Sequence, residues 1–134
     1  MPSQLLADYI KVYDGVLAPE RCRALIDRFE AAPERAIRQV EGGYSFVQLD
    51  VTKSWPDEYR VLQPLFLSIF SNYQADLGVG RCWPKLFYWE HLRLKRYLPN
   101  GRDSFPTHVD AYDNAAASRF VTAIVYLNDV TGGE

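Results

Sequence analysis

This 134-residue sequence has no excess of basic charge, no long apolar run and no cysteine motif. Fifteen Lys and Arg residues against 17 Asp and Glu residues give a formal net charge of −2, which argues against nucleic-acid partners and polybasic membrane modules. No apolar run approaches the roughly 20 residues of a membrane span, and the N-terminus lacks a basic leader region. Cys22 and Cys82 form no CxxC pattern. We therefore expect a cytoplasmic protein with reduced thiols and without nucleic-acid or membrane partners.

The length and composition fit a single domain, expected to span residues 1–134. A hydrophobic fraction of 48% supports one core, and 134 residues are too few for two ordinary domains. Aromatic residues reach 14%, with nine Tyr and seven Phe, which is typical of sheet-rich folds. We divide the domain into a helical support region over about residues 1–82 and a strand region over about residues 83–134.

Two helices are predicted in the support region. An amphipathic helix is expected over residues 18–32, since Pro19 suits a first helical turn and apolar residues recur at helical spacing. A longer helix is predicted over residues 56–78, where an apolar stripe runs to a terminating Gly. Pro64 would kink this second helix or mark its true start.

Strand patterns precede, separate and follow these helices. Residues 8–17 mix β-branched and aromatic side chains and predict a short strand. Residues 42–53 alternate, which places one set of side chains on the same face: Tyr44, Phe46, Gln48 and Asp50. Further strands are expected over 86–98, 105–112 and 119–130. Helices first and strands later indicate an α+β or all-β sandwich plan, mainly β with N-terminal supporting helices.

The tripeptide from His108 to Asp110 is the candidate metal site. In an extended segment, residues two apart point to the same face, so these two side chains would project together. An imidazole and a carboxylate suit a divalent first-row metal, and one more His would complete the facial triad of non-haem Fe(II) oxygenases. A lone HxD pattern arises easily by chance, and the alternative is a surface His beside an Asp turn residue.

The surroundings of this tripeptide carry several further elements in a fixed order. These are Tyr97, Asn100-Gly101, His108-x-Asp110, Arg119-x-x-Thr122, Tyr126-Leu127-Asn128 and Gly132-Gly133-Glu134. In this order and spacing, the last third of the chain resembles the prolyl 4-hydroxylase-like branch of the 2-oxoglutarate- and Fe(II)-dependent dioxygenases. The N-terminal helices match the support layer of that family only loosely.

The resemblance implies a double-stranded β-helix (jelly-roll) core with Fe(II) held by His108 and Asp110, the catalytic centre. It implies that Tyr97, Thr122 and Tyr126 contact the cosubstrate 2-oxoglutarate, and that Arg119 contacts substrate at the mouth of the site. The implied reaction uses O2, with ascorbate as reductant. It hydroxylates a C–H bond of a peptidyl-proline, amino-acid or small-molecule substrate and releases succinate and CO2.

Each of these residues also has an ordinary structural interpretation. Tyr97 and Tyr126 could be sheet aromatics, Thr122 a strand former and Arg119 a solvated strand-end charge. Alternation over residues 86–98 places Lys95, Arg93, His91 and Trp89 on the face of Tyr97. That row either lines an anion-accepting groove, with Arg93 as a substrate contact, or faces solvent, because unpaired burial would be costly. His91 precedes the turn and is not expected to be a metal ligand.

The chain has no His after Asp110. The family pattern places the third metal ligand, and a Lys or Arg that binds 2-oxoglutarate, after the Gly-Gly-Glu motif. We therefore expect these residues to be the N-terminal part of a longer domain, with the jelly roll truncated after its first strands. The strand over 119–130 would then expose an apolar edge through which the chain could self-associate. The alternative is a non-catalytic jelly-roll remnant that acts as a binding or interaction module.

Overall fold

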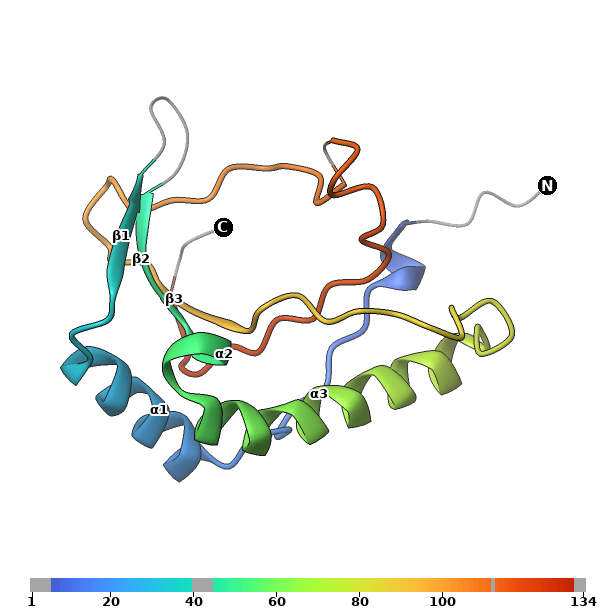
Figure 1. Cartoon of the computed structure of the whole chain (residues 1–134), viewed down its shortest axis with the longest axis horizontal. Coiled ribbons are helices and arrows are strands. Elements are labelled where there is room, and N and C mark those ends of the chain that lie inside the picture. The colour runs from blue at the N-terminus through green and yellow to red at the C-terminus, as the bar shows by residue number, and fades with distance from the viewer. Residues whose placement is uncertain (1–5, 40–44, 112, 132–134) are drawn as a thin grey trace.

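The computed structural model describes residues 6–39, 45–111 and 113–131, and it shows an α+β architecture (Figure 1). Tyr44 and the Gly132-Gly133-Glu134 motif lie outside these residues. The elements, in chain order, are the 3₁₀ helix η1 (Leu6–Tyr9), α1 (Pro19–Ala31), β1 (Ala36–Gln39), β2 (Ser45–Asp50), α2 (Val51–Ser54), α3 (Pro56–Leu77) and β3 (Arg93–Arg96).

The two long helices begin and end close to the predicted residues. Pro19 occupies the first turn of α1, where its missing N–H costs no hydrogen bond, and the helix buries Leu25 and Phe29. Helix α3 runs through Pro64, so this proline does not mark the start of the helix. Gly78 ends α3 in the left-handed region (φ 64°), and its N–H reaches the carbonyls of the last turn.

A short helix, α2, occupies the last residues of the segment 42–53 that was predicted to be a strand. Asp50 is its N-cap, and the side chain accepts a hydrogen bond from the backbone N–H of Lys53 at 3.1 Å. Because this cap satisfies a free N–H of the first turn, the chain turns into a helix immediately after β2. The alternation of residues 45–50 is confirmed, whereas the strand expected over residues 51–53 is wrong.

The sheet has the order β1-β2-β3, and both strand pairs are antiparallel. In the register, Leu49 lies opposite Leu94, and both belong to the face that packs against the helices. The helices lie below the sheet in Figure 1. Phe29 of α1 and Trp55, which precedes α3, complete the contact with this face. The core cluster consists of Phe29, Ala32, Leu49, Val51 and Trp55, with Val47, Tyr59, Leu92 and Leu94 packed against it.

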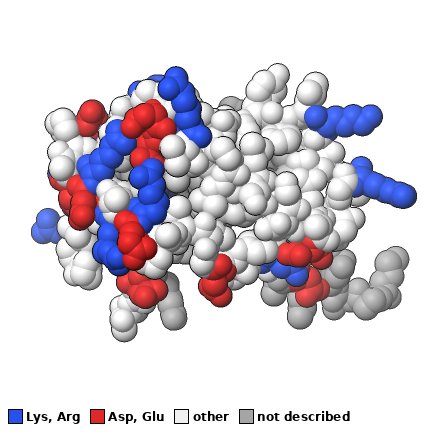
Figure 2. Space-filling model, turned by 90° about the horizontal axis from the view of Figure 1, so that it is seen from below, with Lys and Arg blue, Asp and Glu red and all other residues white. Residues whose placement is uncertain are grey.

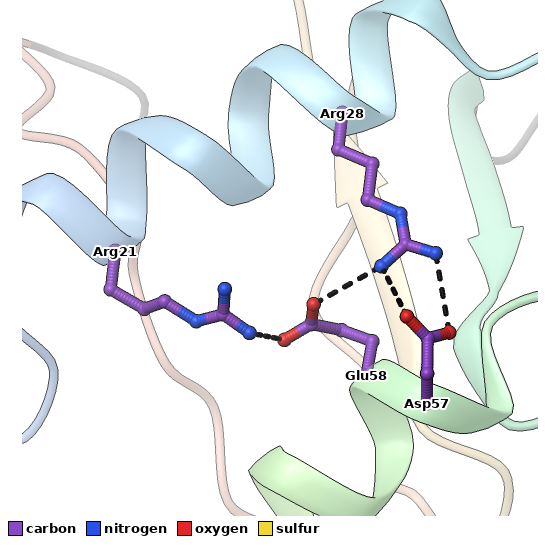
Figure 3. Close-up of polar contacts among 4 residues, drawn as sticks. All are labelled: Arg21, Arg28, Asp57 and Glu58. Carbon is purple, nitrogen blue, oxygen red and sulfur yellow. Dashed lines mark hydrogen bonds and ion pairs between the residues drawn. The ribbon is translucent and has the colours of Figure 1, made fainter.

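An ion-pair network joins α1 to the first turn of α3 (Figure 3). Glu58 is only 4% exposed and accepts hydrogen bonds from Arg21 and, at 3.2 Å, from Arg28. Arg28 also binds Asp57 through two hydrogen bonds of 3.0 and 3.2 Å, which lower the pKa of that carboxyl. Seen from below, charged side chains of both signs gather at the end of the molecule where α1 lies (Figure 2).

Replacing Glu58 by Ala is expected to lower the free energy of unfolding by about 2 kcal/mol, measured by urea denaturation. The loss stays below that of a fully buried pair because Arg21 and Arg28 are partly exposed and regain water. Glu20→Ala is the matched control, since it removes an exposed pair with Arg23 and should cost at most about 0.5 kcal/mol. Equal losses in the two variants would show that the network does not hold the helices together.

Four predicted strands differ from the structure. The strand over residues 8–17 is wrong: Tyr73 donates to the carbonyl of Tyr9 at 2.8 Å and Tyr13 to Asp76 at 2.6 Å, so the segment attaches to α3 through side chains. Only Arg93–Arg96 of the strand over 86–98 pairs with a neighbour. In the described parts of 105–112 and 119–130 no strand forms, and helical residues outnumber strand residues across the described chain.

None of the helices in the described part of the chain is both long and apolar enough to cross a bilayer.

Candidate functional site

The candidate site lies on the face of the sheet that points away from the helices. Gln48 pairs with Lys95 and Asp50 pairs with Arg93 in the register of β2 and β3. Partners directly opposite in an antiparallel pair project to the same side, so these four side chains share this outer face. Phe46 belongs to the same side of β2 and is buried there by residues that follow β3.

A tight turn after β3 returns the chain to this outer face. Gly101 takes a positive φ of 69°, and Asn100 accepts hydrogen bonds from the backbone of Arg102 and Asp103 at 2.9 and 2.8 Å. The Asp103 carboxylate accepts from the backbone N–H of Leu98 at 2.9 Å, which is the main cause of its lowered pKa. The turn leads to a backbone bridge with β2 at Ser104, and His108 follows four residues later.

His108 and Asp110 project side by side, as the sequence predicted. The His108 Nε2 lies 3.2 Å from Asp110 Oδ1, and His108 Nδ1 lies 3.0 Å from the Pro106 carbonyl. The ring of Phe105 contacts the imidazole edge-on, with centroids 4.4 Å apart. Both polar side chains are partly open to solvent, at 45% and 41% exposure, so an ion could reach them.

The hydrogen-bond roles at His108 leave Nε2 as the atom that could bind a metal ion. A backbone carbonyl only accepts, so Nδ1 carries a hydrogen. Thr122 donates a hydrogen bond to Asp110 Oδ2, and this bond is the largest cause of the lowered pKa of Asp110, which is therefore an acceptor. Nε2 thus faces an ionised carboxylate, and these two atoms are the ones that could share a metal ion.

The separation of the two atoms fits two neighbouring positions around a metal. Ligand atoms about 2.1 Å from an ion and at right angles to each other are about 3 Å apart, close to the 3.2 Å observed. One imidazole and one carboxylate also match the donor types of a facial triad. Among the described residues, no group of three or more His, Cys, Asp and Glu side chains is placed to hold a metal. His108 and Asp110 therefore fit two of the three ligands.

Arg119 and Thr122 both hold the Asp110 segment in place. Arg119 donates from Nη1 to the backbone carbonyl of Asp110 at 2.9 Å and from Nε to Glu90 at 2.5 Å. Thr122 binds the Asp110 carboxylate itself. The structure thus places both residues around the HxD segment, and it adds Glu90, which the sequence had not indicated.

The two predicted tyrosines differ in their surroundings. Tyr97 packs against Phe46 with ring centroids 5.3 Å apart, and Phe46 in turn contacts Phe105, which contacts His108. Burial, with a smaller effect of Asp103, raises the pKa of the Tyr97 phenol. Tyr126 is 79% exposed and does not join this aromatic chain.

The predicted basic row divides into two groups. Arg93 and His91 line an open hollow, whereas Lys95 lies 4.5 Å above the Phe105 ring, where burial first and Arg93 second lower its pKa. Trp89 instead packs against Phe70 of α3, with centroids 5.2 Å apart. The hollow has a volume of about 510 Å³ and is lined by Gln48, Asp50, Lys53, Glu90, His91, Arg93 and Arg119.

Comparisons of the chain with protein-family models, with curated protein sequences and with solved structures find no match.

Two centres therefore share the outer face of the sheet. The pair of His108 and Asp110 supplies an imidazole and a carboxylate for a cation, and the hollow supplies Arg, Lys and His donors for an anion. Arg119 connects them, because it contacts the backbone of Asp110 and also lines the hollow.

Proposed function

We propose that this chain carries part of an Fe(II)- and 2-oxoglutarate-dependent dioxygenase of the prolyl 4-hydroxylase-like branch, located in the cytoplasm. The proposal includes the jelly-roll core that the resemblance implies. The observation that carries it is the contact between His108 Nε2 and Asp110 Oδ1, at a separation that suits two ligands of one ion. The ordered elements support it further, since Arg119 and Thr122 both bind Asp110.

Bound Fe(II), with O2 and 2-oxoglutarate, would supply the hydroxylation of a substrate C–H bond, with release of succinate and CO2. His108 and Asp110 would hold the ion. The carbonyl of Pro106 fixes the imidazole so that Nε2 would be the ligand atom, and Thr122 orients the carboxylate. Tyr97 and Tyr126 are proposed to contact 2-oxoglutarate, and the second imidazole ligand is proposed to come from outside these residues. Ascorbate is the proposed reductant.

The activity is tested by measuring succinate formed from 2-oxoglutarate in the presence of Fe(II), O2 and ascorbate. The measurement is made on this chain and on a form extended past Glu134, with His108→Ala as the control. We expect the extended form to produce succinate, and without added substrate this occurs at the rate of uncoupled turnover. The variant should produce only background amounts. If neither form of the protein produces succinate above the variant, the dioxygenase proposal is wrong.

A non-catalytic interaction module is the second candidate, because the described residues hold two metal ligands rather than three. The segment after Arg119 favours it, since Ile124, Tyr126 and Val130 are 70%, 79% and 68% exposed. A second copy of the chain is the partner proposed for this candidate. It predicts dimers in analytical ultracentrifugation that Ile124→Asp disrupts, together with no succinate formation.

A further inference from the structure

The hollow beside β3 combines cationic side chains with carboxylates that are already occupied. Asp50 Oδ2 lies 2.7 Å from His91 Nδ1, and Asp50 Oδ1 caps the backbone N–H of Lys53. Glu90 accepts a hydrogen bond from Arg119. Both carboxylates are thus engaged with neighbours in the wall of the hollow, which leaves their charge partly neutralised before any ligand arrives.

Arg93 and Lys53 are the cations that remain. Neither takes part in an ion pair with any described residue. Arg93 shares the outer face of the sheet with Asp50, its partner in the register, and Lys53 follows Asp50 in α2. The bond to Asp50 also leaves the Nε2 of His91 for another partner.

The total charge of the hollow selects the kind of anion. Three cations and two carboxylates line it, so its formal charge is +1 when His91 is left out of the count. A carboxylate with one negative charge balances this wall, whereas a doubly charged phosphate would leave an excess negative charge beside Asp50 and Glu90. The planar guanidinium of Arg93 can bind a carboxylate through two parallel hydrogen bonds.

We propose that this hollow binds a carboxylate group of a small-molecule ligand through Arg93 and Lys53. The identification of that ligand as the substrate rests on the proposed function. Arg119 lines the hollow and also contacts the backbone of Asp110, so a carboxylate held there would lie beside the metal-binding pair. The substrate class is then a free carboxylic acid, such as an amino acid, rather than a residue inside a peptide chain.

The test is the binding of N-acetylalanine, followed by NMR chemical-shift titration in the absence of Fe(II). N-acetylalanine amide, which lacks the charge but keeps the shape, is the first comparison, and inorganic phosphate is the second. We expect saturable binding of N-acetylalanine that is about tenfold weaker in Arg93→Gln and in Lys53→Gln. Arg102→Gln is the matched control, because it removes one exposed cation in the turn after β3 and should leave the affinity unchanged.

Several results would overturn the proposal. Equal binding of the acid and the amide would show that charge does not matter, and unchanged affinity in Arg93→Gln would exclude the assigned contact. Tighter binding of phosphate would exclude a carboxylate site. Fe(II) binding is measured separately on the same samples, so a chain that binds Fe(II) but not N-acetylalanine refutes only this inference. The reverse result, when it holds for this chain and for the form extended past Glu134, refutes only the proposed dioxygenase.

Discussion

Replacement of Asp110 by Ala is expected to weaken Fe(II) binding by more than about 100-fold. Loss of a partner that only orients a metal ligand commonly costs 10 to 100-fold in affinity, and here the ligand itself is removed. Only His108 of the pair would remain, because no other described His, Cys, Asp or Glu side chain is placed to bind the same ion. Anaerobic titration with Fe(II), followed by isothermal calorimetry, measures the loss in this chain and in the form extended past Glu134.

Two further variants separate ligand binding from charge and from orientation. Thr122→Val keeps the side-chain shape but removes the hydrogen bond to Asp110, so Fe(II) binding should weaken by about tenfold. Asp113→Asn removes a nearby negative charge while keeping an oxygen to accept from the backbone of Ala116, and should leave binding unchanged. The ligand assignment is wrong if Asp110→Ala binds Fe(II) like the unaltered chain, or if Asp113→Asn weakens binding to the same extent.

The helices could be predicted from the sequence because their signals are local. Pro19 at the first turn and Gly78 at the left-handed end each act within a few residues of the helix terminus. The same holds for the alternation in β2, where Phe46 and Leu49 lie on opposite faces and are both buried. Here Phe46 is buried by the returning chain after β3, which the alternation alone could not show.

Strand pairing could not be predicted, because it depends on a partner strand as well as on the pattern of the segment itself, and β2 and β3 are far apart in the sequence. Strand β1 was missed, since its four residues have no strong pattern of their own and gain their hydrogen bonds from β2. The long pattern over residues 86–98 forms a strand only where β2 provides a partner. Alternation indicates which side chains share a face, but it does not indicate where the neighbouring strand begins or ends.

In the candidate site, too, local contacts could be predicted from the sequence and long-range contacts could not. The proximity of His108 and Asp110 follows from their spacing of two residues, and the structure confirms it. Side-chain contacts between residues distant in the sequence could not be predicted from it. His91 contacts Asp50, 41 positions away, and Arg119 contacts Glu90, 29 positions away. Both contacts lie in the lining of the hollow, so the roles of Asp50 and Glu90 there could be recognised only from the fold.

Trp55→Ala is expected to cause the largest loss of stability, about 3–5 kcal/mol in the free energy of unfolding. The side chain is 4% exposed and packs in the core with Phe29 and Leu49. The guanidinium of Arg28 lies 4.3 Å from the centre of its ring, so truncation also removes a cation–π contact between α1 and the start of α3. The backbone hydrogen bond from Trp55 to Val51, which ends α2, does not depend on the side chain and should persist.

Urea denaturation followed by circular dichroism measures this loss. Tyr88→Ala is the matched control: it also removes an aromatic ring, but one that is 97% exposed, and should change the free energy of unfolding by less than about 0.5 kcal/mol. Trp55→Phe keeps a ring under Arg28 and should recover more than half of the loss. If Trp55→Ala and Tyr88→Ala unfold at the same urea concentration, Trp55 does not join the helices to the sheet. The outer face would then need another support, because β2 carries both Leu49 of the core and Asp50 of the hollow.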